Sequence, residues 1–404
     1  MVQPTRKNET DELRPYLRAA HLPAPGTLSL NVSEQQMYFS PAELGRLDLQ
    51  KDDVVIVEGG AGYGRSAYLD DDLNRWGFQN SIVRVRPCPD VSVGRYVYYA
   101  LQHAQADRQI ELEVSTATLP HFTAEKVGRF RLPLPPLETQ RAIANYLDRE
   151  TAEIDGMRAD LDEMERLLTE RRVSVAALHI FGDSDDSSFP RLSLKMVTDK
   201  TFAGEWGKDE GEQQVDRPCV RVADFNRKTN MVNSEVPTIR SYTPKNVAEK
   251  TLKTGDLLIE KSGGTNINPV GNVIEYVGPD GPLCSNFIQV VRLNTEQHPR
   301  YWQQAHLAAY QTGITNLHVH QTTGIQNLDL TGFTSEKYPA PPLAEQRRIA
   351  DEIDRETAEI DSMLEDITKL RDLLAERRSA VISAAVTGQI DIPVSPTYKD
   401  EAHA

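Results

Sequence analysis

The chain contains one stretch of 50 residues twice. The first copy occupies 133–182 and the second 339–388, and they align without a gap, with about half of the positions identical. A match of this kind is far above chance and indicates an internal duplication. Its period is a whole domain plus a helix, much longer than the roughly 20–50 residues of solenoid repeats. The sequence therefore predicts two related halves, each of which ends in the same element.

Each copy is predicted to form one long helix. Pro-Pro pairs at 135–136 and 341–342 exclude a helix interior there, and Gly182 and Gly388 are natural helix stops. Between these limits, apolar residues recur at alternating spacings of three and four, which indicates a coiled-coil seam over about five heptads. The predicted seam residues are Ile143, Leu147, Ile154, Met157, Leu161, Met164, Leu168, Val175 and Leu178 in the first copy, and Ile349, Ile353, Ile360, Met363, Ile367, Leu370, Leu374, Val381 and Ala384 in the second.

Charged residues interrupt the two seams at equivalent places. A parallel pairing in register would put glutamate on glutamate and arginine on arginine, whereas one antiparallel register satisfies both charge pairs. We therefore expect an antiparallel intramolecular coiled coil with approximate two-fold symmetry. The alternative is that these charges reach solvent and the helices bind other partners. The pairs expected in the antiparallel register are Glu150 with Arg377, Glu356 with Arg171, and Met164 with Met363.

The regions outside the helices are predicted to form two mixed α/β units, which gives an α+β fold. Short strands are predicted in the first unit at 16–19, 54–57 and 82–86. In the second unit, 219–223, 255–259 and 285–288 are similar to 16–20, 52–56 and 79–82. Roughly 186–216 has no counterpart in the first unit, which we expect to be shortened at its N-terminus. The predicted boundaries are 1–132 for the first unit, 133–182 for the central helix, 183–338 for the second unit, 339–390 for the distal helix and 391–404 for a tail.

Composition limits the classes of function. A chain of 404 residues can hold two or three domains, and its three cysteines indicate a reducing, cytoplasmic setting. No apolar run is long enough to span a membrane. The net charge of −15 argues against general nucleic-acid affinity, but both long helices are acidic, which leaves room for a local basic face. We find no catalytic constellation, metal motif or nucleotide fingerprint, so the chain is predicted not to be an enzyme.

Several glycine-containing loops carry groups suited to nucleic acid. Cations, hydroxyls, amides and exposed backbone amides are the groups that contact phosphates and base edges. Taken alone, each of these loops is more often ordinary surface, but two similar units on a rigid rod suit the reading of two separated DNA segments. The candidate DNA-binding residues are Gly62, Tyr63 and Arg65 in the first unit, and Lys261, Ser262, Gly263, Thr265, Asn266, Gln321, Thr322 and Thr323 in the second.

With these features together, the chain resembles the specificity subunit of type I restriction–modification systems. The helices carry much of the resemblance, in PPL-x-x-Q-R-x-I-A at 135–144 and 341–350, Leu-Leu-x-Glu-Arg-Arg at 167–172 and 373–378, and Ala-Val-Thr-Gly-Gln-Ile at 385–390. The segments outside the helices that also resemble the family are 57–60, 77–81, 255–256, 261–263 and 322–325.

The resemblance implies two target-recognition domains that each read one half of a split sequence in double-stranded DNA. It implies that the helices separate these domains and dock two modification subunits, which hold S-adenosylmethionine and methylate adenine. Restriction subunits that use ATP and Mg²⁺ would then join, and this chain would hold no cofactor. It further implies that the helices act as a ruler, so that longer helices lengthen the spacer of the target.

Two other interpretations remain open. The first is a coiled-coil scaffold whose globular units bind protein or carbohydrate and have no role on DNA. Retention on duplex DNA that weakens with salt would count against it. The second is a methyltransferase or nuclease in its own right, which the missing cofactor and metal motifs disfavour.

Overall fold

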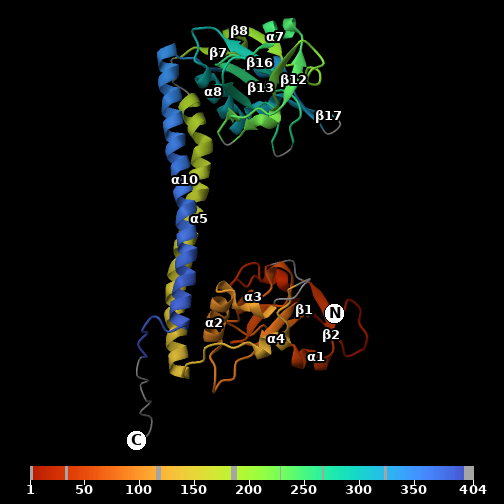
Figure 1. Cartoon of the computed structure of the whole chain (residues 1–404), viewed down its shortest axis with the longest axis vertical. Coiled ribbons are helices and arrows are strands. Elements are labelled where there is room, and N and C mark those ends of the chain that lie inside the picture. The colour runs from red at the N-terminus through yellow and green to blue at the C-terminus, as the bar shows by residue number, and fades with distance from the viewer. Residues whose placement is uncertain are drawn as a thin grey trace. The chain divides into compact units, whose positions relative to one another are not determined.

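The protein was analysed as a computed structural model, which describes residues 3–31, 35–114, 120–182, 189–227, 229–265, 268–322 and 325–394. It divides into two compact units (Figure 1). The first unit comprises 1–161 together with 368–404, and the second unit comprises 162–367. Each unit contains one globular domain and a portion of each of the two long helices, α5 (Leu137–Phe181) and α10 (Leu343–Val386).

The globular domain of the first unit is built on two small sheets. The order β4-β3-β6 forms one antiparallel sheet, and β2-β1-β5 forms the other. All four residues of β3 are buried, because α2 packs on one face of its sheet and residues around Leu17 and Leu49 cover the other. The elements are β1 (Glu12–Leu17), β2 (Gln36–Phe39), α1 (Pro41–Arg46), β3 (Val54–Val57), β4 (Ser66–Tyr68), β5 (Gly77–Phe78), β6 (Ile82–Val85), α2 (Gly94–Ala106), α3 (Gln109–Val114) and α4 (Ala124–Arg129).

The globular domain of the second unit repeats this plan with additions. Its sheets are β14-β13-β16-β8 and β12-β9-β15, with three further two-stranded pairs: β10 with β11, β17 with β18, and β19 with β7. The elements are β7 (Arg191–Ser193), α6 (Leu194–Val197), β8 (Thr198–Ala203), β9 (Val215–Val220), β10 (Phe225–Asn226), β11 (Met231–Val232), β12 (Ile239–Tyr242), α7 (Pro244–Lys250), β13 (Asp256–Glu260), β14 (Val273–Tyr276), β15 (Leu283–Cys284), β16 (Ile288–Leu293), α8 (Pro299–Gln311), β17 (Val319–Thr322), β18 (Ile325–Leu328), α9 (Leu330–Ser335) and β19 (Lys337–Pro339).

The two domains share a plan, element by element. In both, an N-capping hydroxyl, Ser40 or Thr243, followed by proline starts a short helix after the edge strand. In both, a fully buried central strand pairs with two antiparallel neighbours. The second unit adds β8 alongside β16, and the sheet of the first unit has no strand there among its described residues. The predicted α+β fold with two mixed domains is confirmed.

The long helices run antiparallel within each unit. In the first unit, Ile143 and Leu147 near the start of α5 share a hydrophobic cluster with Ile382 and Ala385 near the end of α10. In the second unit, residues near the end of α5, such as Val175, share a cluster with residues near the start of α10. Contacts of this kind, start against end in both units, require antiparallel helices. The predicted antiparallel coiled coil is confirmed.

The glutamine shared by the two helix starts ties each long helix to its domain. Gln346 is 1% exposed, donates to the carbonyl oxygen of Pro341 at 2.8 Å and accepts from the backbone amide of His298 at 2.9 Å. Gln140 makes the equivalent bonds to Pro135 and Val93, at 2.7 and 2.9 Å. When a buried amide loses such a hydrogen-bond partner, the folded protein is destabilised by roughly 1–3 kcal/mol. The repeated Pro-Pro-Leu-x-x-Gln motif is therefore a junction between domain and helix.

Candidate nucleic-acid interface

Two polar loops meet in the second unit. The segment that follows β13 pairs with β18, because Gly263 donates its backbone amide to Gln326 at 3.1 Å and Leu328 donates to Lys261 at 2.9 Å. The Ser262 hydroxyl lies 2.6 Å from Oδ1 of Asn327. The predicted loop 261–265 and the hairpin β17–β18 therefore form one continuous surface, which we call the polar loop surface.

The predicted residues of the second unit lie on this surface. Gly263, Thr265 and Gln321 are exposed, whereas Lys261 and Ser262 are half-buried. Burial lowers the pKa of Lys261. Gly263 has a φ of +104°, a backbone conformation that favours glycine. No atom of the described residues beyond its two chain neighbours lies within 4 Å of the position that a Cβ atom would take there, so this side of the loop is open. Thr322 ends β17, but its side chain lies outside what the structure describes, as do residues Asn266 and Thr323 altogether.

An arginine that the sequence analysis did not single out completes the surface. Arg227, which directly follows β10, forms an ion pair with Glu260 at 2.5 Å and donates to the Tyr310 hydroxyl at 3.5 Å. Glu260 is 1% exposed, and burial raises its pKa, an effect that Arg227 opposes. A buried carboxylate needs such a partner. The glutamate at the end of an otherwise apolar strand was the signal that a cation had to lie nearby.

The equivalent loop of the first unit is arranged differently. Gly62 is buried, and Tyr63 is half-buried and packs against the hydrophobic core. The guanidinium of Arg65 donates to the backbone carbonyls of Gly62 and Pro23. These three residues shape their loop, and the structure does not bring them together as a set of exposed contacts. An isolated β-bridge joins Gly59 to His121, as another joins Ser262 to Asn327 in the second unit. Residues 115–119, which precede His121, lie outside the described residues.

The helix-pairing residues are joined only in part as expected. Arg171 lies 3.7 Å from Glu356, as the antiparallel register predicts. Glu150 instead lies 3.5 Å from Arg149, and no ion pair of Arg377 is found within the described parts of the chain. The cross-helix bonds of the first unit come from Arg378, the next residue along. In the second unit the equivalent arginines, Arg171 and Arg172, both pair with α10, so the two units differ at this position.

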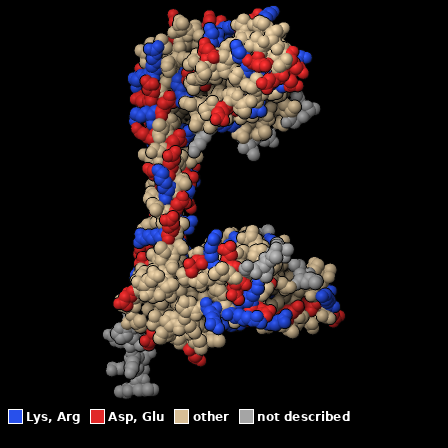
Figure 2. Space-filling view, in the orientation of Figure 1, with Lys and Arg blue, Asp and Glu red and all other residues tan. Residues whose placement is uncertain are grey.

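One arginine–aspartate ion pair between the helices is duplicated. Arg172 holds Asp361 through two hydrogen bonds of 2.5 and 3.1 Å, and Arg378 lies 3.3 Å from Asp155. These four residues occupy equivalent positions in the two copies of the repeat. Along both helices, positive and negative side chains alternate over the surface (Figure 2). The register is therefore fixed by an arginine–aspartate pair in each unit.

Parts of the predicted seam are exposed. Met164 and Met363 are 51% and 52% exposed, so they do not form a closed contact between the helices. A two-helix seam has no third layer to cover its flanks, and seam residues are buried chiefly where a globular domain packs against them. The same three positions of the repeat expose large apolar side chains in both units: Met157, Leu370 and Leu373 in the first, and Met363, Met164 and Leu167 in the second.

Two absences hold for the described residues only. No group of three or more histidine, cysteine, aspartate or glutamate side chains there is arranged to hold a metal ion. In the same part of the chain, no helix combines the length and the apolar character needed to cross a bilayer.

Comparisons with known proteins agree with the resemblance noted in the sequence. A family model described as "Type I restriction modification DNA specificity domain" matches residues 14–166. The EcoBI specificity subunit of Escherichia coli is 29% identical over 146 residues, which cover 34% of this chain and 30% of that protein. The StySPI specificity subunit of Salmonella potsdam is 28% identical over 170 residues, covering 41% of this chain and 36% of that protein. The matched part thus spans about a third of these curated relatives.

Solved structures share the whole fold. The HsdS subunit of Thermoanaerobacter tengcongensis matches with a TM-score of 0.62, covering 96% of this chain and 95% of that one at 16% identity. A chain from a structure described as the basis of complex assembly and conformational transition of the type I R-M system matches with a TM-score of 0.71, covering 96% of both chains, also at 16% identity. Taken with the family match over 14–166, the duplicated domains and the antiparallel helices, these likenesses show that the chain is similar to type I restriction–modification specificity subunits, in sequence over part of its length and in fold over nearly all of it.

Proposed function

We propose that this chain reads a bipartite sequence in double-stranded DNA and carries the modification and restriction subunits that act on it. The observation that carries the proposal is the polar loop surface of the second unit. There a guanidinium, an ammonium, side-chain amides and a hydroxyl are gathered on loops held to one another by hydrogen bonds. Such a set can contact both the phosphates and the base edges of a duplex.

Different side chains of the polar loop surface are suited to different parts of the DNA duplex. Arg227 is oriented by Glu260 and Tyr310, so its fork of donors is suited to the O6 and N7 acceptors of guanine in the major groove. Gln321 and Asn327 are exposed amides, the groups that pair with adenine. Lys261 and the loop around Gly263 are suited to phosphate contacts, which position the protein without specifying sequence.

The long helices supply the docking surfaces. Because the same three apolar positions are exposed in each unit, we expect one copy of the same partner on each, which fits two modification subunits. Those subunits would hold S-adenosylmethionine, and the restriction subunits would use ATP and Mg²⁺. In this proposal the chain works in the cytoplasm, binds no cofactor and performs no catalytic step.

The decisive test is to co-express the chain with its modification subunit and to map methylated adenines across the genome. The expected result is one split motif with a fixed spacer. Arg227→Ala and Gln321→Ala should relax only the half read by the second unit, whereas Arg166→Ala, on the exposed face of α5, should leave the motif unchanged. If a complex forms and no motif is methylated, the proposal fails.

The alternative, a scaffold that does not bind DNA, makes a different prediction in vitro. The complex with the modification subunit should be retained on duplex DNA, and retention should weaken as salt rises, because bound phosphates release counterions. If the complex is not retained on DNA even at low salt, the interpretation as a scaffold without DNA binding is favoured.

A further inference from the structure

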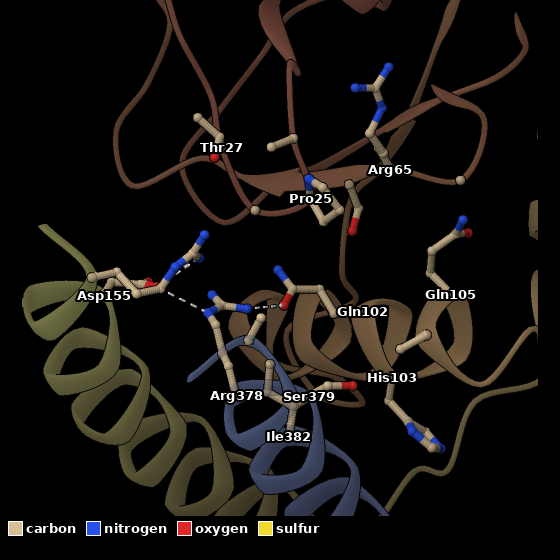
Figure 3. A pocket seen from close by; sticks show the side chains of 17 residues that line it. Pro25, Thr27, Arg65, Gln102, His103, Gln105, Asp155, Arg378, Ser379 and Ile382 are labelled. Carbon is tan, nitrogen blue, oxygen red and sulfur yellow. Dashed lines mark hydrogen bonds and ion pairs between the residues drawn. The ribbon is translucent and has the colours of Figure 1, made fainter. Parts of the chain in front are cut away.

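A cavity of about 520 Å³ lies within the first unit, where loops of the globular domain face the long helices (Figure 3). Its walls come from the loops at 24–27 and 64–66, from α2, and from α5 and α10. The volume is within the range of pockets that take small molecules, roughly 300–1,000 Å³. Nothing in the proposed DNA-reading function uses this space, which we call the basic cavity.

Two amide side chains in the basic cavity have unpaired polar atoms. Gln102 is 8% exposed, and its Oε1 accepts a hydrogen bond of 3.0 Å from Arg378, which turns its Nε2 toward the cavity (Figure 3). That nitrogen has no hydrogen-bond partner among the described residues, and neither has the buried Oε1 of Gln105. Buried polar groups are nearly always paired. The cavity therefore offers one donor and one acceptor to an occupant.

The charge of the cavity is positive, although the whole chain carries −15. Arg65, Arg158 and Arg378 line it together with one carboxylate, that of Asp155. Asp155 lies 3.3 Å from Arg378 and 4.0 Å from Arg158, so its charge is already matched. The guanidinium of Arg65 is turned away from the cavity and donates to backbone carbonyls (Figure 3), so the other charged groups leave a formal charge of +1, which favours an anion. Tyr98 lies beside this group: burial raises the pKa of its hydroxyl, and Arg378 opposes that rise.

The second unit has apolar residues at two positions that are polar in the basic cavity of the first unit. The pair Arg378 and Asp155 is repeated there as Arg172 and Asp361. At the positions equivalent to Gln102 and Arg158, however, the second unit has Leu307 and Leu364, and Leu364 packs against the hydrophobic core. An apolar side chain is therefore compatible with the fold at both positions. The polar residues of the first unit are not needed to hold the helices together.

A glycine keeps the cavity wall close to these groups. Gly64 has a φ of +77°, and a Cβ atom there would lie 2.1 Å from Oε1 of Gln105. The loop can approach α2 only because this position is glycine. The wall is thus shaped around the unpaired acceptor.

We propose that the basic cavity binds a phosphorylated small molecule of nucleotide size. A phosphate monoester carries about two negative charges at neutral pH, so its charge is opposite in sign to that of the site. Its oxygens would accept from Arg158 and Arg378, guanidinium groups that suit phosphate geometry. The Nε2 of Gln102 would donate to the rest of the molecule, and Oε1 of Gln105 would accept from it. The bound molecule would bridge the globular domain to α5 and α10 of the first unit.

The test is calorimetric titration of the full chain with adenosine 5′-monophosphate, inorganic phosphate and adenosine. We expect saturable one-to-one binding of the monophosphate, weaker binding of phosphate, and binding of adenosine weaker by at least tenfold. Arg158→Leu and Gln102→Leu introduce the residues found at the equivalent positions of the second unit. Each should lower the affinity for the monophosphate about tenfold or more, the loss expected for a charge-assisted hydrogen bond. Arg166→Leu removes the same charge from α5 outside the cavity and should change nothing.

Three outcomes would overturn the proposal. The first is the absence of saturable binding of the monophosphate and of phosphate to the unaltered chain, a result that needs no variant to fold. The second is unchanged affinity in both leucine variants, once circular dichroism shows that they are folded. The third is displacement of the monophosphate by duplex DNA with the same dependence on Arg158, which would make the cavity a contact for the DNA backbone.

Discussion

His306 is a single buried residue that makes the folding stability of the second unit depend on pH. It lies in α8, fully buried, with its ring centroid 4.9 Å from those of both Phe333 and Tyr338. Neither ring nitrogen has a hydrogen-bond partner within the described residues. Burial lowers the pKa of His306 from its usual 6.5 to about 3. The folded protein therefore holds this imidazole neutral where the unfolded chain would protonate it.

The sign of the resulting pH dependence follows from this depressed pKa. The stability associated with a neutral His306 is fully present above pH 6.5 and is lost as pH falls toward 3, because only the unfolded state gains the proton. Between pH 6.5 and 5 the loss is about 2 kcal/mol, at about 1.4 kcal/mol for each pH unit. We expect His306→Leu, which copies Leu101 at the equivalent place in α2, to remove this dependence.

Urea unfolding of both proteins at pH 7.5 and 5.0 checks this prediction. The unaltered chain should lose about 2 kcal/mol more than His306→Leu between the two values, since other titrating groups are common to both proteins. Equal losses would show that His306 is protonated in the folded state.

At the scale of the helices, the register rests on arginine–aspartate pairs. We predict that Arg172→Glu and Asp361→Arg each destabilise the second unit and that the double variant recovers about 0.5–1 kcal/mol, as expected for partly exposed pairs. Chemical denaturation of the two single variants and the double variant measures this coupling.

The matched control is the cycle of Glu150→Arg with Arg377→Glu. These side chains do not meet in the structure, so their coupling energy should be close to zero. A larger recovery for this pair than for Arg172 with Asp361 would place the helices in a different register.

The exposed apolar positions of the helices give a prediction about stoichiometry. Leu167 in the second unit and Leu373 in the first are equivalent, 50% and 59% exposed, and on this proposal each belongs to one docking surface. Leu167→Glu or Leu373→Glu alone should reduce the bound modification subunits from two to one, and the double variant should bind none. Native mass spectrometry counts the copies. Retention of two copies by the double variant would move the docking surface elsewhere.

Much at this scale could be predicted from the sequence, and the reasons are physical. Long seams, proline starts and glycine stops are local signals, and the duplication made the antiparallel pairing follow from charge. The choice of Arg378 over Arg377 could not be predicted, because a heptad pattern gives the stripe but not which flanking arginine turns inward. Arg227 was missed because its role depends on Glu260, a contact between residues 33 positions apart. Tyr63 and Arg65 were assigned from composition, which does not show that their loop turns them toward the protein.

At the scale of the whole molecule, the two domains are joined by helices that belong to both units. α5 has 45 residues and α10 has 44, so each is about 65 Å long at 1.5 Å per residue. If each unit reads one half of the target, as proposed, the number of residues in these helices should set the distance between the two halves. A change of helix length should therefore change the spacing of the DNA halves and not their sequences.

Insertion of four helix-forming residues between 161 and 162, and of four between 367 and 368, tests this directly. Both sites are boundaries between the two units, so each domain keeps its own contacts. The insertion adds about 6 Å, which is close to two base pairs at roughly 3.4 Å each, and turns the helices by about 40°. We expect the methylated motif to keep both halves and to gain one or two base pairs of spacer. The same four residues placed between Gly388 and Gln389, beyond the end of α10, should leave the spacer unchanged. A motif with altered halves and the original spacer would mean that helix length does not measure the distance between the two halves of the target.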